Sequence, residues 1–375
     1  MNRLQFSAPC LMGLEGICAD ELKRLEIENV RAENGRVLFE GDFSTLARAN
    51  LCSRYSERIQ LLLGEFYVYS FEDLFQGVSK IRWEELIGEK EAFPVKGHSV
   101  SSKLSSIPDC QKIIKKAVAK RLGARYGTSW LEETGSIHQI QFLIIKDKCS
   151  IMLDTSGAGL HKRGYRANSA AAPIKETLAA AMAELSRVRP FSTVIDPFCG
   201  SGTILIESAL KALNIAPGIR RSFAAEKWSI IPSSVWSLER ERAMDNVRHD
   251  AEFQAFGYDI DDNAISLTLE NARKAGVEKR IRAEKRDISD FEENLERAAV
   301  ICNPPYGERL LDMEKARELY KIMGEKFIPK QGWSYSIISP DDNFENIFGR
   351  PADKRRKLYN GMIKCQLYMY FRNNT

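Results

Sequence analysis

The strand, glycine turn and helix predicted in residues 193–210 constrain the fold of this 375-residue chain most strongly. The first four of these residues form a short strand rich in β-branched side chains, and residues 203–210 have the apolar content of a buried helix. Between them, Gly200 and Gly202 permit close approach of the backbone to a ligand, and the helix start presents free N–H groups. This order of elements predicts an α/β fold with a ligand bound at the turn.

Two nucleotide-binding motifs resemble this turn, and both fit it poorly. The Walker loop ends in Gly-Lys-Ser or Gly-Lys-Thr, which is missing here, and the dinucleotide motif needs a third glycine where Leu205 stands. The acidic Asp196 at the strand end disfavours a bound pyrophosphate and suits a ligand that carries ammonium and sulfonium groups. The predicted ligand contacts at this turn are Asp196, Phe198, Gly200, Ser201, Gly202 and Thr203.

A second motif, Asn303-Pro304-Pro305-Tyr306, follows the short apolar strand 300–302, and its four residues are the predicted catalytic contacts. The lone pair of an exocyclic amine on a nucleobase is delocalised into the ring, so the amine must be drawn toward tetrahedral geometry before it can attack. The Asn303 side-chain oxygen and the Pro304 carbonyl can each accept one N–H of such an amine. Tyr306 offers a face on which the base can stack. The alternative is that Asn-Pro-Pro-Tyr is an ordinary loop after a strand, without a catalytic role.

Eight cysteines are scattered along the chain without a Cys-x-x-Cys pair, so neither a zinc site nor a disulfide framework is predicted, and no metal is expected. Cys199 and Cys302 lie inside the two motifs, which raises the alternative of a cysteine nucleophile, as in cytosine-ring methylation. That chemistry presents Pro-Cys on the catalytic loop, whereas Cys302 precedes Asn303 at the end of an apolar strand. We therefore interpret Cys302 as a small buried residue.

Together the two motifs resemble those of class I methyltransferases that use S-adenosylmethionine, from about Ala170 to the C-terminus. The resemblance implies this cofactor and a Rossmann-like, doubly wound, seven-stranded sheet. Its last strands form a hairpin, predicted here around an Asn360-Gly361 turn. In that family, residues after the second and third strands and at the first helix contact the cofactor. The matching residues here are Asp259, Ile260, Asp287, Ile288 and Glu176.

The spacing of these motifs predicts an insertion. About 57 residues separate Gly202 from Asp259, whereas a dinucleotide-type unit places its acidic residue about 20 residues after the glycines. Residues 216–236 contain Arg220, Arg221 and two Trp, which favours a lobe beside the cofactor cleft. The alternative is a surface excursion without substrate contact.

The N-terminal half is predicted to have a separate role. The chain exceeds a typical single domain of about 100 to 150 residues, so more than one domain is expected. No stretch resembles a signal peptide or is apolar enough to span a membrane, so a soluble, cytoplasmic protein without membrane partners is expected. The net charge is +4, yet residues 101–166 hold 12 Lys and Arg against five Asp and Glu. A stripe that contacts RNA phosphates, or alternatively a solvated helix face, is predicted at Lys112, Lys115, Lys116 and Lys120.

The sequence around this stripe resembles a THUMP domain, an RNA-binding module. The run Gly159–Arg166, followed by Ala172–Ala180, resembles the segment that links THUMP to the catalytic core in a bacterial family of RNA guanine methyltransferases. The large-subunit rRNA member of that family begins with a ferredoxin-like domain. The resemblance therefore implies an α+β ferredoxin-like and THUMP region before the core, with domains at 1–65, 66–160 and 161–375.

The linking segment combines positive charge with a stacking ring, so RNA contact is predicted there, with a solvated linker as the alternative. The residues concerned are Lys162, Arg163, Tyr165 and Arg166.

The hypothesis from the sequence is methyl transfer from S-adenosylmethionine to the exocyclic amine of a guanine in RNA, with the base drawn out of its stack. The preferred substrate is 23S rRNA, and tRNA is the near alternative. Guanine over adenine rests on the resemblance alone, so an adenine methyltransferase on DNA or RNA stays open. A non-catalytic RNA-binding scaffold is the alternative from another class, and the missing third glycine disfavours a Rossmann oxidoreductase.

Overall fold

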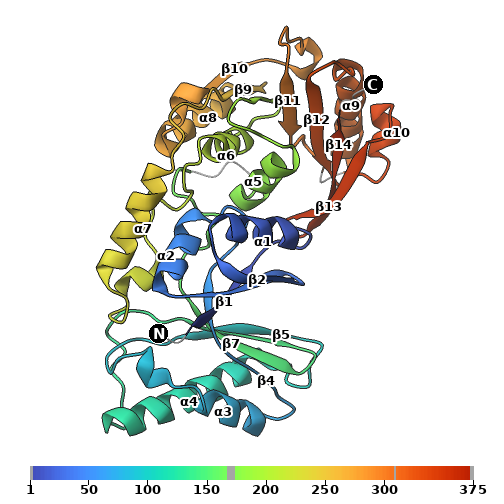
Figure 1. The fold of residues 1–375 in the computed structure, drawn as a ribbon. Coiled ribbons are helices and arrows are strands. Elements are labelled where there is room, and N and C mark those ends of the chain that lie inside the picture. Colours follow the sequence, from blue (N-terminus) through green and yellow to red (C-terminus); the bar gives the residue numbers. More distant parts are fainter. Residues whose placement is uncertain (1–2, 167–173, 308–309, 372–375) are drawn as a thin grey trace.

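The computed structural model describes residues 3–166, 174–307 and 310–371. Within them lie two seven-stranded sheets, one in each half of the chain. Figure 1 shows the two sheets one above the other, with α7 (Ser233–Asp245) running along the side of the molecule between them. Within the described residues, no helix combines the length and the apolar character needed to cross a membrane.

The C-terminal sheet has the strand order β10-β9-β8-β11-β12-β14-β13. β14 runs antiparallel to both of its neighbours, and the remaining neighbours are parallel. From β8 the chain builds outward through β9 and β10, and then returns to β11 on the other side of β8. Ligands bind α/β sheets at such a reversal of strand order. The strands are β8 (Thr193–Asp196), β9 (Gln254–Asp259), β10 (Ile281–Lys285), β11 (Ala298–Cys302), β12 (Trp333–Ser339), β13 (Lys354–Asn360) and β14 (Ile363–Tyr370).

Helices cover both faces of this sheet. Successive residues of β8 alternate between the two layers: Val194 packs in the same core as residues of α5 and α6, and Ile195 in the same core as residues of α9 and α10. The alternation follows from the two-residue period of a strand. The expected Rossmann-like, doubly wound, seven-stranded sheet is thereby confirmed. The helices are α5 (Glu176–Leu185), α6 (Thr203–Ala212), α8 (Asp262–Ala275), α9 (Leu310–Lys326) and α10 (Phe344–Phe348).

The C-terminal hairpin forms one residue later than the predicted Asn-Gly turn. Asn360 still belongs to β13 and pairs with Ile363, so Gly361 and Met362 are the central residues of the turn. Gly361 has φ +63°, and glycine at the first central position is typical of a type II′ turn. The shift leaves Asn360 inside the sheet, where its side chain can be held in a fixed direction.

The N-terminal sheet is continuous through both regions that the sequence predicts as separate domains. Its order is β2-β3-β1-β4-β7-β6-β5. β4 pairs with β1 on one side and with β7 on the other, and the expected boundary near residue 65 falls inside β4. The elements are β1 (Leu4–Pro9), α1 (Glu15–Arg24), β2 (Glu28–Glu33), β3 (Arg36–Gly41), α2 (Phe43–Cys52), β4 (Gln60–Tyr67), α3 (Phe71–Ser79), β5 (Val95–Val100), α4 (Ile107–Tyr126), β6 (Ile140–Ile145) and β7 (Lys148–Asp154).

The insertion packs against the N-terminal half and not beside the cofactor cleft, so the expected lobe is wrong. α7 contacts α2, as Figure 1 shows. Trp228 donates its indole N–H to the Ile137 carbonyl at 3.1 Å and stacks on His138 with ring centroids 4.5 Å apart. Phe223 stacks on Trp236 at 5.4 Å. Trp228 therefore fastens the insertion to the N-terminal half, while the Phe223–Trp236 stack lies within the insertion itself. Residues 216–236 are absent from the lining of the cofactor cleft.

Candidate cofactor and substrate pocket

The two sequence motifs meet at the carboxyl edge of the C-terminal sheet. β9, β8 and β11 are parallel neighbours, so the loops that follow them lie side by side. A cavity of about 700 Å³ opens between these loops. Of the predicted site residues it is lined by Asp196, Phe198, Gly200, Ser201, Thr203, Asp259, Ile260, Asp287, Ile288, Asn303, Pro304, Pro305 and Tyr306.

The glycine turn is held from behind by α8. Thr268 donates its hydroxyl to the Gly200 carbonyl at 2.9 Å, and Asn271 donates its side-chain N–H to the Ser201 carbonyl at 3.0 Å. Gly202 has φ +77°, and a Cβ there would lie 2.8 Å from the Thr268 methyl. Gly202 therefore permits packing against α8 and does not itself line the cavity.

Asp196 is the buried carboxyl group of the pocket, with 1% of its surface exposed. Burial, with a smaller contribution from the neighbouring Asp259, raises the pKa of this carboxyl to about 8, against a hydrogen bond from the Phe198 backbone N–H at 3.1 Å. A cation placed beside Asp196 would favour its ionised form. The electrostatics therefore suit a ligand with an ammonium group.

Asp259 and Asp287 end β9 and follow β10. One Asp259 oxygen accepts the Gly200 N–H at 3.0 Å and the other accepts the Asp261 N–H at 3.0 Å, which fixes the carboxylate at the lip of the glycine turn. Asp287 accepts the Ser289 N–H at 2.8 Å, and this bond holds its pKa below the usual value. Both groups are thus available as acceptors for hydroxyl or amine donors of a ligand.

The catalytic loop is oriented by a hydrogen-bond chain that sequence reasoning missed. Asn360, from β13, donates its side-chain N–H to the Tyr306 hydroxyl at 3.3 Å, and Tyr306 donates in turn to the Asn303 side-chain oxygen. Burial raises the pKa of Tyr306 above its ordinary value, so its hydroxyl stays protonated and able to donate. Because a carbonyl oxygen has two lone pairs, Asn303 keeps one for a further donor in the cavity.

The cysteines of the two motifs are buried and poorly suited to act as nucleophiles. Burial raises the pKa of the Cys199 and Cys302 thiols, which disfavours the reactive thiolate. Among the described residues there is also no group of three or more His, Cys, Asp or Glu side chains arranged to hold a metal ion.

Glu176 and Arg166 are paired with each other beneath the cavity, at 3.4 Å. Arg166 also donates to the Ile174 carbonyl at 2.6 Å and to the Thr203 hydroxyl at 2.5 Å. Glu176 does not line the cavity, and Arg166 is half-buried. Cofactor contact at Glu176 and RNA contact at Arg166 therefore stay predictions. Arg166 contacts the start of α6 through Thr203 and supplies the cationic partner that the buried Glu176 carboxylate needs.

Arg163 and Tyr165 are also internal, each 4% exposed, so the prediction that they contact RNA is wrong. Arg163 lies 3.4 Å from the fully buried Glu207 of α6, and Tyr165 donates its hydroxyl to the same carboxylate at 3.0 Å. Arg163 further donates to the Arg54 carbonyl at 2.6 Å. The linker is thus fastened to the C-terminal core, and Lys162 is the predicted linker residue with an exposed side chain.

The lysine stripe lies on α4. Lys112, Lys116 and Lys120 are exposed, four residues apart, and so share one face of the helix. Lys115 is turned away from them, since it pairs with Glu133 and lies over the Phe93 ring at 3.7 Å. Three of the four predicted cations therefore form a solvent-facing stripe.

A doubly wound sheet with a glycine turn after its first strand and Asn-Pro-Pro-Tyr after its fourth defines a class I methyltransferase. Profile comparison agrees: residues 163–369 match the RMKL-like methyltransferase domain, residues 5–60 the RlmL ferredoxin-like domain and residues 68–154 the THUMP domain. The chain belongs to the RMKL-like methyltransferase family.

Curated relatives cover this chain almost completely. It is 42% identical to the "Putative RNA methyltransferase YpsC" of Bacillus subtilis, over 99% of this chain and 97% of that protein. It is 34% identical to the "Ribosomal RNA large subunit methyltransferase K/L" of Psychromonas ingrahamii, over 98% of this chain. The chain spans about half the length of that K/L protein, of which 50% is matched.

Solved structures share the whole fold. One, from Listeria monocytogenes, is titled a predicted N6-adenine-specific DNA methylase and has a TM-score of 0.95 at 41% identity, covering 100% of this chain and 97% of that one. Another, SMU.472, is titled a "putative methyltransferase complexed with SAH" and has a TM-score of 0.94 at 40% identity over 100% of both chains. The expected resemblance to methyltransferases with appended THUMP and ferredoxin-like regions is thereby confirmed.

Proposed function

We propose that this protein transfers a methyl group from S-adenosylmethionine to the exocyclic amine of a guanine in RNA, with 23S rRNA as the substrate. The observation that carries the proposal is the juxtaposition of Asn303 and Tyr306 with the carboxylates of Asp196, Asp259 and Asp287 in one cavity. An amine-binding loop and an acidic, apolar-walled cofactor site are both needed for this reaction, and here they face the same space.

The cavity fits S-adenosylmethionine. Its volume of about 700 Å³ lies in the range of ligand sites, and its walls combine three carboxylates with apolar side chains such as Ile204 and Ile288. Asp196 is suited to the ammonium group, Asp259 to the ribose hydroxyls and Asp287 to the adenine amine. Bound there, the cofactor supplies an electrophilic methyl group on its sulfonium.

The chain's own contribution to the reaction is to hold the amine. Asn303 accepts one N–H with its free lone pair, and the Pro304 carbonyl accepts the other. Tyr306 stacks on the ring, with its hydroxyl kept on Asn303 by the contact from Asn360. Positioning and oriented dipoles of this kind supply most of the rate enhancement.

Contact with RNA is proposed at the exposed cations Lys112, Lys116 and Lys120 of α4 and at Lys162 of the linker. The matched THUMP region supports RNA over DNA as the substrate. We propose three units, at residues 1–65, 66–160 and 161–375. The first two share one sheet and are proposed to bind RNA together.

The names of the relatives differ on the target base. The K/L proteins and YpsC are named for RNA, which supports the proposal, while the Listeria structure is titled for adenine in DNA. Adenine and tRNA therefore stand as the competing substrates that an experiment must separate.

The test is incubation of the protein with S-adenosylmethionine carrying a labelled methyl group and total RNA from cells that lack the gene. The RNA is then digested and the labelled nucleoside identified by mass spectrometry, with genomic DNA in parallel. Labelled N2-methylguanosine in large-subunit rRNA is expected. Label in tRNA or in adenine would show that the substrate is a different one from that proposed. Cofactor binding without any label would favour a non-catalytic RNA-binding scaffold.

A further inference from the structure

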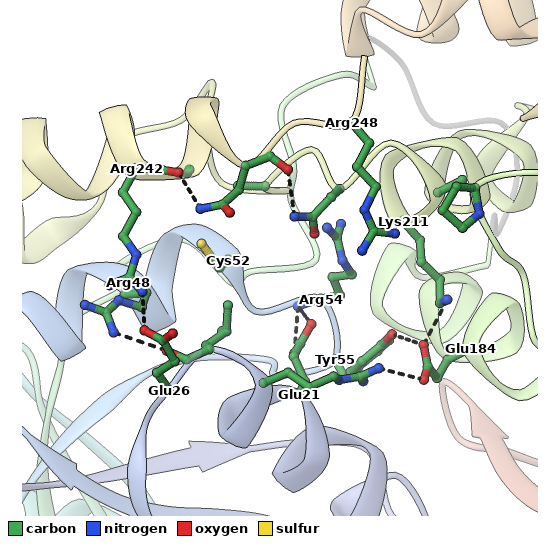
Figure 2. Close-up of a pocket in the computed structure, with 18 of the residues that line it drawn as sticks. Glu21, Glu26, Arg48, Cys52, Arg54, Tyr55, Glu184, Lys211, Arg242 and Arg248 are labelled. Carbon is green, nitrogen blue, oxygen red and sulfur yellow. Dashed lines mark hydrogen bonds and ion pairs between the residues drawn. The ribbon is translucent and has the colours of Figure 1, made fainter. Parts of the chain in front are cut away.

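A second cavity, of about 380 Å³, lies between the N-terminal half and the C-terminal core. Figure 2 shows it bounded by α1 and α2 of the N-terminal half, by α7 (yellow) above and by the green helices of the core at the right. It lies at the far end of α6 from the first pocket: Thr203 begins this helix in the first pocket, and Lys211 and Ala212 end it in the second. A helix of ten residues spans about 15 Å, so the two cavities are separate.

The walls of this second cavity carry an excess of positive charge, with seven Arg and Lys side chains against four Glu. The carboxylates are already occupied. Glu184 accepts from Tyr55 at 3.0 Å, from Lys211 at 3.1 Å and from Arg24 at 3.2 Å. Glu239 accepts both contacts of the Arg48 guanidinium, at 2.8 and 2.9 Å. The remaining two acids are likewise engaged: Glu26 pairs with Arg242, and Glu21 accepts from Ser53 and the Arg54 backbone.

Three guanidinium groups of this cavity have no carboxylate within ion-pair distance among the described residues: Arg54, Arg189 and Arg248. The Arg54 guanidinium donates to the Ile215 carbonyl at 2.9 Å, although the residue is 8% exposed. Figure 2 shows Arg54 and Arg248 extending into the cavity, Arg248 without a marked contact. Arg54 is the buried group of the three, and its charge partly offsets the burial that raises the pKa of the nearby Glu21, whereas Arg189 and Arg248 are exposed. Because positive side chains outnumber carboxylates around this cavity, an anion placed here would be stabilising.

The cations also act on one another. The pKa of Lys211 lies below its ordinary value, chiefly because of burial, and the charges of Arg189 and Arg54 depress it further against the attraction of Glu184. Like charges from both halves of the protein therefore converge on the same space.

We propose that this cavity binds a phosphoryl group, held by Arg54 from the N-terminal half and by Arg189 and Arg248 from the core. Guanidinium groups bind phosphate oxygens through paired N–H donors, and several such groups around one anion make a specific site. The bound anion would bridge the two halves of the molecule. Its source is either a small phosphorylated molecule or a phosphate of the RNA backbone.

The test is isothermal titration of the full chain with inorganic pyrophosphate. Arg248→Gln and Arg189→Gln remove exposed guanidinium groups that make no ion pair among the described residues, so both variants should fold. Arg273→Gln, an exposed arginine on α8, is the matched control. Pyrophosphate is expected to bind the wild-type chain and the control equally, and at least about tenfold more weakly to each of the two variants.

A second arm separates the two sources and uses RNA binding alone, so it does not depend on methyl transfer. If the site takes an RNA phosphate, Arg248→Gln reduces the slope of log affinity against log salt by about one. If it takes a small phosphorylated molecule, the slope is unchanged while pyrophosphate binding is lost. The proposal is overturned if wild-type protein binds no pyrophosphate and the slope does not change, or if the variants bind pyrophosphate like the control.

Discussion

In the cofactor pocket, most of the important side chains lie at the end of the strand that places them or just after it, whereas in the seam between the two halves the important side chains bind partners distant in sequence. Asp196, Asp259 and Asn303 all come at the ends of parallel strands. In the seam, Arg163 binds Glu207 and Trp228 binds Ile137. An Arg or Tyr in a linker can therefore face solvent or support the interior, and the difference depends on a partner that the local sequence does not reveal.

The largest expected effect is at the seam. Glu207→Ala leaves the buried Arg163 without its counter-charge, so the free energy of unfolding should fall by about 3–5 kcal/mol. Urea unfolding measures this loss, with the exposed Glu278→Ala as the control. Equal stability of the two variants would mean that Arg163 is solvated and that the linker is free to contact RNA.

In the pocket, Asn303→Ala should reduce methyl transfer by roughly 10²- to 10³-fold, by analogy with the loss of one oriented hydrogen-bonding group. Affinity for S-adenosylmethionine should stay nearly constant, because Asn303 acts on the amine. The exposed Asn34→Ala is the control. Lost cofactor binding would show that Asn303 supports the pocket structure instead.

Asp196→Asn should separate stability from function. Its folded pKa of about 8 lies above the ordinary value, so the stability linked to the neutral carboxyl is present below about pH 4 and is lost as pH rises through about 8. The variant without cofactor should gain stability relative to wild type across this window, by on the order of 1 kcal/mol per pKa unit.

The same variant should bind S-adenosylmethionine about 10- to 100-fold more weakly, because it lacks the charge that meets the ammonium. Thermal unfolding from pH 4 to 9 and calorimetric titration provide the two measurements. A variant less stable than wild type at pH 8 would contradict the assignment of Asp196 as a buried carboxyl with a raised pKa.

Asn360→Ala removes one contact to Tyr306, which is worth about 1 kcal/mol, so the maximal rate should fall about fivefold at unchanged cofactor affinity. Combined with Tyr306→Phe, the effects should be less than additive, since both act on the orientation of Asn303. Single-turnover methyl transfer measures the three variants. Full additivity would place Asn360 outside the chain that orients Asn303.

The smallest effect compares two neighbours in the linker. Lys162→Gln should reduce the salt slope of RNA binding by about one, because it removes one phosphate contact. Tyr165→Phe should leave RNA binding unchanged, because the hydroxyl that it removes binds Glu207. The opposite pattern would assign the RNA contact to Tyr165 and remove Lys162 from the proposed RNA surface.

The C-terminal sheet and most of the pocket followed from the sequence because strand ends carry their own motifs. The local sequence does not show which distant residue a side chain or strand will pair with. Asn360 reaches Tyr306 across 54 residues, and the hairpin turn lies one residue beyond the expected dipeptide because Asn360 pairs with Ile363. The continuity of the N-terminal sheet was hidden for the same reason, since β4 pairs with β7 about 90 residues later.

The position of β4 in the N-terminal sheet affects the distance between α4 and the pocket. Because this strand pairs with β1 and with β7 at once, the α4 side of the sheet cannot swing without breaking the ladder to the other side. Trp228 and Arg163 fasten this sheet to the C-terminal half, so α4 is held at a fixed distance from the methyl-transfer pocket. If an RNA contacts both the α4 lysines and the methyl-transfer pocket, as proposed, its target base must lie at one set distance from the part of the RNA bound at α4. The shape of the RNA would then determine, as much as its sequence, which nucleotide is modified.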